Sequence, residues 1–541
     1  MIDARNDVDV LIVGAGPVGL AAAIELGQRN IRCLVVERND RVGYSPRAKT
    51  TNVRTREHLR RWGIADALRR ASPISPDRPS TVVFATRMNG YPLARFENAM
   101  NGTRERNNLY SEEAQWVPQY VLEDVLRAKA QTLPGVEIRF QTECAGFVQR
   151  EDGVTAQLRD LRGGTETAVN CAYLIGADGP RSGVRNSIGA KMVGDGALPR
   201  SFSIIFRAPA LAERQIHGGA IMYWMVNDDV PSMLGPMDEL GLWSFMATKL
   251  AGTTDPASLD AVDLVRRGTG IKDLDVEIVS TDLWVASRLM ADKYSERRVF
   301  LAGDSCHLHP PFGGFGMNMG IGDAVDLGWK LAGRLQGWGG EHLLQSYELE
   351  RRPVHEHTIA EAMANFGTVT NHLVQPGIEV PGALGDATRR EVSEIIAATK
   401  QREFKTLGIV LGQRDATSPI IVSDGTAPPA EHFMLYVPSA HPGCLAPHLW
   451  LADGSSLYDH FGSGFTLLIT EGRVDDVVAL QAAAAQNSIP LTVLCGIDAR
   501  LHARYEARFI IIRPDQHVAW RGNKIPSAPT ELWRRITGAQ S

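Results

Sequence analysis

The order of apolar and polar positions divides the chain into regions of different character. An apolar run at residues 8–13, VDVLIV, is followed by GAGPVG, the helix-like LAAAIELGQRN and a second apolar run, IRCLVVER. This succession predicts a βαβ unit and therefore a parallel sheet covered by helices. From about residue 190 to 290 the pattern alternates and is rich in aromatic residues, as in GGAIMYWMV, which favours an antiparallel sheet. The pattern of the last ~110 residues is typical of a separate small α/β domain.

Composition narrows the classes of protein that fit this pattern. The chain has 541 residues, 44% of them hydrophobic, and a formal charge of −5 without a basic block, which argues against nucleic-acid binding. The uncharged stretch at residues 10–24 is short for a bilayer span and follows aspartates, so we expect no targeting segment and no membrane association. Six widely spaced cysteines without a Cys-x-x-Cys pair indicate reduced thiols. These features predict a cytoplasmic protein.

The motif GAGPVG lies between the first predicted strand and the first predicted helix. Gly14, Gly16 and Gly19 allow a tight turn, close approach of a pyrophosphate and close helix–strand packing, and the helix N-terminus attracts the anion. Glu37 ends the second strand, where a carboxylate can accept ribose hydroxyls. The motif predicts dinucleotide binding but leaves FAD and NAD both open.

Two further motifs resemble those of a known family. YLIGADGPRSGVR at 173–185 and RVFLAGDSCHLHPP at 298–311 resemble the DG and GD signatures of single-component (class A) FAD-dependent aromatic hydroxylases, the para-hydroxybenzoate and phenol hydroxylase group. SYELERRPV at 346–354 and PGCLAPHLWL at 442–451 are similar to the phenol hydroxylase and 2-hydroxybiphenyl monooxygenase branch. The resemblance covers residues 8 to 365 and the C-terminal region.

The resemblance implies an α/β fold in three parts. A glutathione-reductase-like FAD-binding domain carries an inserted antiparallel-sheet substrate domain, and a thioredoxin-like domain without redox cysteines follows. The expected bounds are 1–80, 121–190 and 285–365 for the FAD-binding domain, 81–120 and 191–284 for the substrate domain, 366–425 for a helical linker and 426–541 for the thioredoxin-like domain.

The family's cofactor-binding residues can be carried over to matching positions. The GD aspartate, Asp304, is expected to bond the ribityl chain, and Asp178 to lie near the pyrophosphate and to take part in nicotinamide-cofactor binding. Arg47 and Gln119 fall where relatives contact the flavin and its ribityl chain. The complete set of expected cofactor contacts is Gly14, Gly16, Pro17, Gly19, Glu37, Arg38, Arg47, Gln119, Asp178, Gly179, Asp304, Pro311, Gly314, Gly316, Met317 and Asn318.

The loop that holds Asp304 also contains Cys306, His307 and His309, which raises two other hypotheses. Three potential ligands could form a metal site, but their spacing differs from that of zinc sites and no partner pair stands out. A nucleophilic cysteine would need an orienting group and a cleft that the sequence does not reveal. We therefore expect no metal site and a loop that holds flavin, in which GFGMN begins a helix whose N–H groups face the ring.

The implied reaction uses NAD(P)H and O2: NAD(P)H reduces FAD, and a C4a-hydroperoxyflavin then hydroxylates a phenolic substrate. Lys49 stands where relatives carry an aspartate or histidine base. A lysine near its usual pKa is a poor base but a good electrostatic clamp, so the sequence favours an acidic phenol such as a nitrophenol or nitrocatechol. The alternative is that Lys49 points to solvent or to a carboxylate.

Candidate residues follow for the reaction and the substrate pocket. The expected catalytic residues are Lys49, Arg47 and Pro310. Because strand residues alternate between faces, about half of the aromatic candidates are expected to face away from the ligand. The expected substrate contacts are Lys49, His217, Tyr223, Met225, Trp243, Trp284 and Phe312.

Two other functions fit the same motifs. Some relatives with this fold oxygenate polycyclic metabolites or antibiotics, and a non-catalytic, partner-binding flavin-fold protein is a second alternative. Relatives with a thioredoxin-like domain are often dimers, so a homodimer is expected.

Overall fold

Strands from residues 8–301 build the predicted parallel sheet. The computed structural model describes residues 6–40, 48–196, 200–248, 258–285, 287–368, 373–415 and 417–539. The main strand order is β18-β19-β10-β1-β2-β7, and β1 pairs in parallel with both β2 and β10. The strands of this sheet, including the β8–β9 extension at its edge, are β1 (Val8–Val13), β2 (Cys33–Glu37), β7 (Val136–Phe140), β8 (Thr142–Gln149), β9 (Val154–Asp160), β10 (Glu166–Gly176), β18 (Ser295–Glu296) and β19 (Val299–Leu301).

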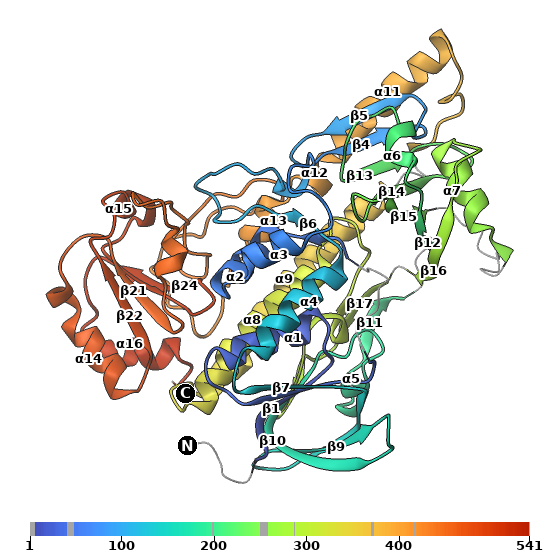
Figure 1. Cartoon of the computed structure of the whole chain (residues 1–541). Helices are drawn as coiled ribbons and strands as arrows, with labels where there is room; N and C mark the ends of the chain where they lie inside the picture. The colour runs from blue at the N-terminus through green and yellow to red at the C-terminus, as the bar shows by residue number, and fades with distance from the viewer. Residues whose placement is uncertain are drawn as a thin grey trace.

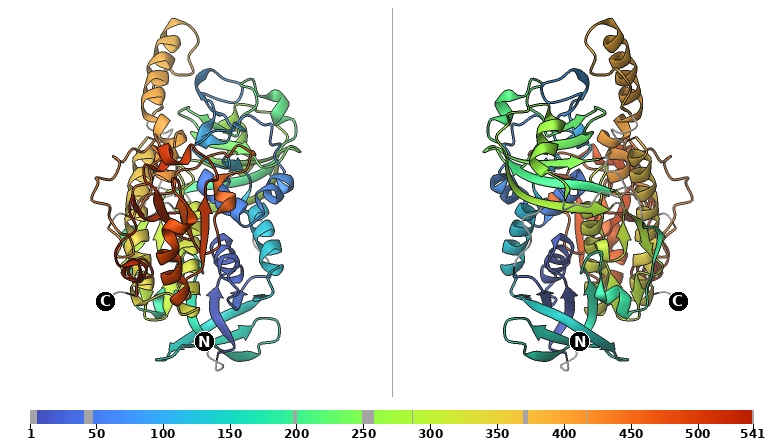
Figure 2. Two further views of the ribbon diagram at one scale, coloured as in Figure 1. Left: turned by 90° about the vertical axis from the view of Figure 1, so that its left-hand side faces the viewer. Right: turned by 90° about the vertical axis from the view of Figure 1, so that its right-hand side faces the viewer.

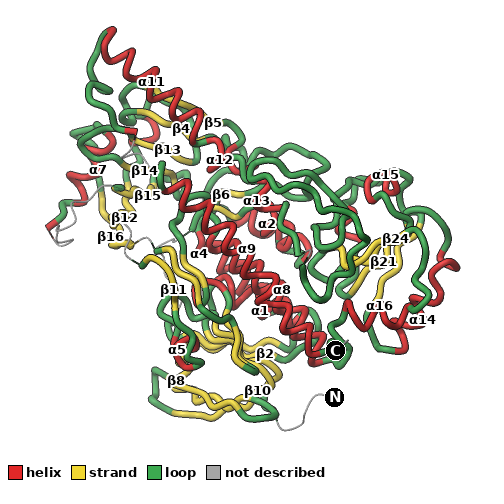
Figure 3. Tube along the Cα trace, turned by 180° about the vertical axis from the view of Figure 1, so that it is seen from behind, coloured by secondary structure: helices red, strands yellow, loops and turns green. Residues whose placement is uncertain are grey.

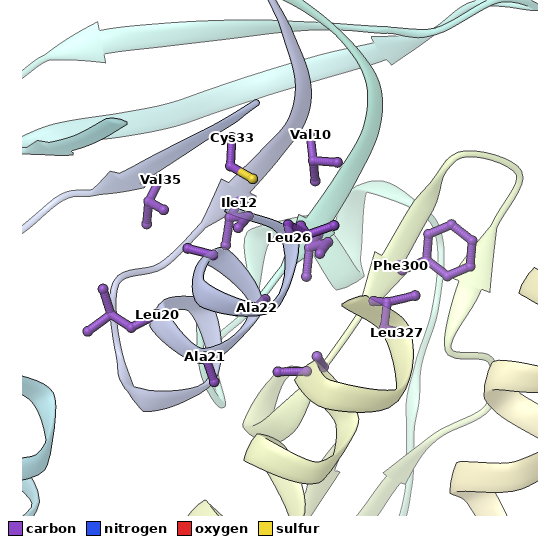
Figure 4. Packing of buried hydrophobic residues seen from close by; sticks show 14 of the residues in the cluster. Val10, Ile12, Leu20, Ala21, Ala22, Leu26, Cys33, Val35, Phe300 and Leu327 are labelled. Atoms are coloured by element: carbon purple, nitrogen blue, oxygen red, sulfur yellow. The ribbon is translucent and has the colours of Figure 1, made fainter. Parts of the chain in front are cut away.

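Long helices cover this sheet and form the centre of the molecule (Figure 1). They are α1 (Pro17–Gly27), α4 (Gln119–Gln131), α8 (Gly316–Leu335) and α9 (Glu341–Phe366). Figure 4 shows Leu26 of α1 near the strand residues Val10 and Ile12, and Leu327 of α8 next to Phe300 of β19. The two helices approach closely because α8 carries glycine where it meets α1: a Cβ on Gly328 would lie 2.6 Å from Cβ of Glu25.

The second sheet has seven strands in the order β16-β12-β15-β14-β13-β4-β5. It is antiparallel except for the β13–β4 pair, and its strands are β4 (Val82–Ala85), β5 (Pro92–Phe96), β12 (Arg200–Arg207), β13 (Met222–Met225), β14 (Ser232–Pro236), β15 (Leu242–Ala247) and β16 (Glu277–Val285). Helix α7 (Ala261–Thr269) packs against one face through Val265. Helix α11 (Ala383–Thr399), which projects from the molecule in Figure 2, packs Val392 and Ile396 against the other face beside Phe84. The expected linker thus also covers part of this sheet.

Short elements connect the two sheets. Residues 53–71 form two helices, α2 (Val53–Arg61) and α3 (Ala65–Ala71), because Gly63 adopts a φ of +77° between them. A two-stranded pair, β3 (Thr50–Thr51) with β6 (Gln115–Trp116), lies next to α2 in the chain. The remaining short elements before residue 412 are α5 (Gly183–Ser187), β11 (Met192–Asp195), α6 (Leu211–Arg214), β17 (Arg288–Ala291), β20 (His307–Leu308), α12 (Gln401–Phe404) and α13 (Leu407–Leu411).

The C-terminal region forms a separate core around a four-stranded sheet in the order β22-β21-β23-β24. Only the β21–β22 pair is parallel, and helices pack on the sheet as expected of a thioredoxin-like domain. Its elements are β21 (Phe465–Ile469), α14 (Val478–Gln486), β22 (Leu491–Cys495), α15 (Leu501–Tyr505), β23 (Phe509–Ile512), β24 (Val518–Gly522) and α16 (Pro529–Ile536). Figure 3 shows this domain beside α8 and α2. Among the described residues, no helix combines the length and hydropathy that a membrane crossing requires.

Candidate functional site

The glycine turn after β1 has the geometry that the sequence predicts. Gly14 has a φ of +108°, and a Cβ there would lie 2.3 Å from the carbonyl oxygen of Ala177. A Cβ on Gly19 would lie 1.9 Å from the carbonyl oxygen of Gly14, so larger side chains are excluded at both positions. At Gly16 no heavy atom comes within 4 Å of a Cβ position, which leaves that side of the turn open. Pro17 is the first residue of α1, whose N-terminus therefore adjoins this open side.

Glu37 lies at the end of β2, directly beside the same turn. Its Oε2 accepts a hydrogen bond from the backbone N–H of Ala15 at 3.1 Å, and Oε1 accepts one from the N–H of Asn39 at 2.9 Å. The carboxylate is thus fixed next to the position that a ribose attached to the pyrophosphate would occupy. The side chain of Arg38 is exposed beside it.

The DG motif contributes a second acidic group near the turn. Asp178 accepts the N–H of Val184 with Oδ2 at 3.1 Å, while its buried Oδ1 has no hydrogen-bond partner within the described structure. Gly179 follows with a φ of +80°. Arg185 is buried and donates to the carbonyl oxygens of Ser305 and Pro180, both at 3.1 Å, so it ties the DG motif to the GD motif and is not a surface ion pair.

The GD motif leads into α8 through a loop that Asn318 connects to the rest of the site by hydrogen bonds. The Asn318 side chain accepts the N–H of Asn52 at 2.9 Å and donates to the carbonyl oxygens of Thr50 at 2.9 Å and Gly314 at 2.7 Å. No described side chain caps the N-terminus of α8, which begins at Gly316 and Met317. The uncapped N–H groups and the helix dipole are suited to an electron-rich ring edge.

Other predicted cofactor residues lie around this loop. The backbone N–H of Gln119 donates to Ala48 at 3.0 Å, and its side chain donates to Glu123 at 2.7 Å at the start of α4. Pro310 is buried and Pro311 is exposed at the beginning of the loop, and Asp304 is partly buried in the turn Gly303–Ser305. Arg47 lies outside the described residues.

Together these groups fit FAD. The open glycine turn and the N-terminus of α1 suit a pyrophosphate, Glu37 suits a ribose, and the uncapped start of α8 suits the flavin ring. The buried polar atoms that lack a partner in the described structure include Oδ1 of Asp178 and Nε2 of His309. Such atoms are costly unless a ligand or water satisfies them. The described groups are therefore suited to the pyrophosphate, a ribose and the flavin ring.

The cysteine and histidines of the GD motif do not have the properties of a nucleophile or an open metal site. Burial raises the pKa of the Cys306 thiol well above its usual range, and Sγ donates to the carbonyl oxygen of Gly303 at 3.3 Å. Cys306 and His307 do lie close to Asp323, but both carboxylate oxygens of Asp323 are engaged by hydrogen-bond donors. His309 bonds the carbonyl oxygen of Pro310 at 2.7 Å, and burial lowers its pKa to about 4.

Lys49 points toward the seven-stranded sheet, not toward solvent. Its Nζ donates to Oγ of Ser244 on β15 and lies 5.7 Å from the ring centre of Trp116. In the described part of the chain no carboxylate pairs with it, and burial lowers the pKa of Lys49 to about 7. The premise of a lysine near its usual pKa is therefore wrong, because desolvation disfavours the charged form.

The two faces of the seven-stranded sheet have different surroundings. Tyr223, Met225 and Trp243 belong to the core between this sheet and α7, on the face opposite to Ser244. Because adjacent strand residues point to opposite faces, these three predicted substrate contacts do not share a face with Ser244 and Lys49. His217, another predicted contact, bonds the carbonyl oxygen of Arg87 at 2.9 Å.

The face toward Lys49, here called the Lys49 face, is lined by residues that sequence reasoning missed. Met246 on β15 pairs with Met233 on β14, and Met222 lies on the next strand with the same parity. These residues are Met222, Met233, Ser244 and Met246, with Trp116 beside them. Phe312, a predicted substrate contact, packs 6.1 Å from Trp224, which has the same parity. The side chain of Trp284 is not among those described.

Two family models match this chain. Residues 7–362 match the family model "FAD binding domain", and residues 439–539 match "Aromatic-ring hydroxylase, C-terminal". A tetracenomycin B2 monooxygenase-dioxygenase from Streptomyces olivaceus is 34% identical over 97% of both chains, and a 4-methyl-5-nitrocatechol 5-monooxygenase from a Burkholderia species is 30% identical over 97% of this chain and 95% of the other. The rebeccamycin biosynthetic enzyme RebC with reduced flavin superposes with a TM-score of 0.90 and 35% identity, over 98% of this chain and 99% of that one.

Proposed function

Since the chain belongs to the FAD-dependent aromatic hydroxylases, we propose that it hydroxylates a phenolic compound whose ionised hydroxyl group is held by Lys49. FAD, when bound, supplies the electrophilic oxygen derived from O2. The chain's own contribution is to bind the aromatic ring on the Lys49 face, to exclude water and to stabilise the phenolate, which is more electron-rich than the phenol.

The observation that carries this proposal is the environment of Lys49. A buried lysine whose pKa is lowered to about 7 gains most from an anionic partner, because pairing with the anion restores the charged form. Ser244 orients the amine at the sheet surface. The same ion pair forms whether a neutral Lys49 accepts the phenol proton or a charged Lys49 meets a phenolate. Because the pKa of Lys49 is low, an acidic phenol gives its proton to the amine more readily than an ordinary phenol does, so an acidic phenol is favoured.

Two classes of phenol suit this surface. Acidic single-ring phenols such as nitrophenols or nitrocatechols are the first candidate, in keeping with the Burkholderia relative that is named for a nitrocatechol. The row of Met222, Met233 and Met246 favours a second candidate, a larger polycyclic phenol, because flexible thioether side chains adapt to extended flat rings. NADPH or NADH is proposed as the reductant, and a homodimer as the functional assembly.

Coupled turnover tests this function. The purified protein is expected to be yellow and to oxidise NAD(P)H faster when a nitrophenol, a nitrocatechol or a hydroxylated polycyclic quinone is added. Hydroxylated product, measured by mass spectrometry with 18O2, identifies the accepted class. The matched control is the methyl ether of the best substrate, which has the same ring but cannot ionise. A protein without flavin, or equal hydroxylation of the methyl ether, would refute the proposal.

A further inference from the structure

Asp323 on α8 is a fully buried carboxylate behind the GD motif. It accepts four hydrogen bonds: from the backbone N–H of Gly303 at 3.0 Å, Nε2 of His307 at 2.9 Å, Nε2 of His355 at 2.8 Å and Nε of Arg351 at 2.9 Å. These donors come from separate segments of the chain. One side chain thus joins α8 and α9 to the GD turn and to β20.

The charge of Asp323 is maintained by its donors. Arg351 and the two histidines hold the pKa of Asp323 well below its usual range despite burial, and burial lowers the pKa of His355 to about 3. The neutral His355 ring donates from Nε2 to Asp323 and accepts the hydroxyl of Tyr294 at Nδ1, 2.8 Å away. With both carboxylate oxygens engaged by donors, the cluster acts as a hydrogen-bonded anchor.

The hydrogen bonds of Asp323 fix the backbone at Gly303, where a glycine would otherwise allow the most conformational freedom. Gly303 has a φ of +65°, a conformation that few other residues adopt, and a Cβ on Gly320 of α8 would lie 3.0 Å from its Cα. Asp304 follows directly, and α8 starts at Gly316, only two turns of helix before Asp323. The same carboxylate therefore sets the distance between the turn of Asp304 and the helix N-terminus proposed to face the flavin ring.

We propose that Asp323 is a positioning residue for FAD. It holds the GD turn and the N-terminus of α8 at a fixed distance from each other, so that the turn can contact the ribityl chain while the helix N-terminus contacts the flavin ring. This inference rests on the proposed roles of Asp304 and α8 toward FAD. It explains why a saturated, buried carboxylate lies behind the cofactor site without touching the cofactor: preorganisation lowers the ordering cost of binding.

Glu350 provides a matched control for the test. Its carboxylate is also buried and bonded by cations, Lys330 at 2.6 Å and Arg513 at 2.8 Å, but it faces the C-terminal domain. Removing charge at either position costs stability for the same reason, the loss of partners for buried cations. Only Asp323 contacts the GD turn.

The apoproteins of the wild type, Asp323→Asn and Glu350→Gln are reconstituted with FAD, and the FAD dissociation constant of each is measured. The temperature is one at which circular dichroism shows all three to be folded. We expect the FAD dissociation constant to rise at least tenfold in Asp323→Asn, with altered visible circular dichroism of the bound flavin, and to stay within twofold in Glu350→Gln. An unchanged affinity in Asp323→Asn, or an equal rise in both variants, would overturn the proposal.

Two further results have defined meanings. If Asp323→Asn does not fold, His307→Phe is the test, because it removes one donor to Asp323 and keeps an aromatic ring. An increase of at least threefold in the FAD dissociation constant supports the anchor, and no increase overturns it. If the wild type itself binds no FAD, the proposed function fails, and this inference fails with it. A wild type that binds FAD beside an unaffected Asp323→Asn refutes the inference alone.

Discussion

At the scale of a single residue, Lys49 shows both what the sequence predicts and what only the structure reveals. The aligned motif predicted its position, and the structure adds its partner Ser244 and its low pKa, which depend on burial and could not be read from neighbouring letters. The glycines of the dinucleotide turn were predictable because backbone geometry restricts each position to one residue type. Met222 and Met246 were not, because the sequence does not reveal which parity of a strand faces the ligand.

The stability of the folded protein should depend on pH through Lys49. Its folded-state pKa of about 7 lies below the ordinary value of 10.5, so between these values the unfolded chain binds a proton that the folded chain lacks. Stability then rises with pH from about 7 to about 10.5, and burying the lysine costs the fold most below 7. With both proteins saturated with FAD, Lys49→Met should therefore be more stable than the wild type at pH 6, and the difference should shrink by pH 9. Thermal unfolding at constant ionic strength checks this, and an equal difference at both pH values would contradict it.

At the scale of elements, the βαβ unit was predictable from the order of apolar and polar positions. The helix predicted to begin in GFGMN starts at Gly316, whereas that order does not indicate the break at Gly63 between α2 and α3. Such a break depends on tertiary packing, since a single glycine can be tolerated inside a helix. The packing of α11 on the seven-stranded sheet involves residues far apart in the chain and has no local signal.

The two faces of that sheet predict opposite effects for two methionines. Met225 is fully buried in the core against α7, so Met225→Ala should lower the free energy of unfolding by about 2–5 kcal/mol. Met246 is only partly buried on the Lys49 face, so Met246→Ala should change the substrate KM at least threefold and lower stability by less than about 1 kcal/mol. Urea unfolding and steady-state kinetics on both variants test the assignment, and the reverse pattern would show that the faces are misassigned.

At the scale of the whole molecule, the C-terminal domain is attached through a buried network of charges. Arg513 donates to both carboxylate oxygens of Glu350 on α9, at 2.8 and 2.9 Å, and also pairs with Asp515. Trp329 of α8 donates to Asp515 at 3.1 Å. The sequence indicated a separate domain at this end, but it could not indicate this contact, because Glu350 and Arg513 are 163 residues apart along the chain.

Breaking this network should destabilise the protein as a whole. Arg513→Leu leaves the buried carboxylate of Glu350 without its bidentate partner, and the free energy of unfolding should fall by about 3–5 kcal/mol. Arg473→Leu is the control, because Arg473 forms an exposed pair with Asp475 that should contribute about 0–1 kcal/mol. Chemical denaturation followed by tryptophan fluorescence measures both, and equal losses in the two variants would show that burial is not the determining factor.

The protonation state of a bound nitrophenol tests the central claim most directly, since its ionised form has its own absorption band. Difference spectra are recorded while the pH is varied, for 4-nitrophenol bound to the wild type and to Lys49→Met. We predict that the apparent pKa of the bound phenol falls by at least one unit in the wild type and does not fall in Lys49→Met, because the variant lacks the ammonium group of Lys49. Identical titration curves for the two proteins would contradict the account.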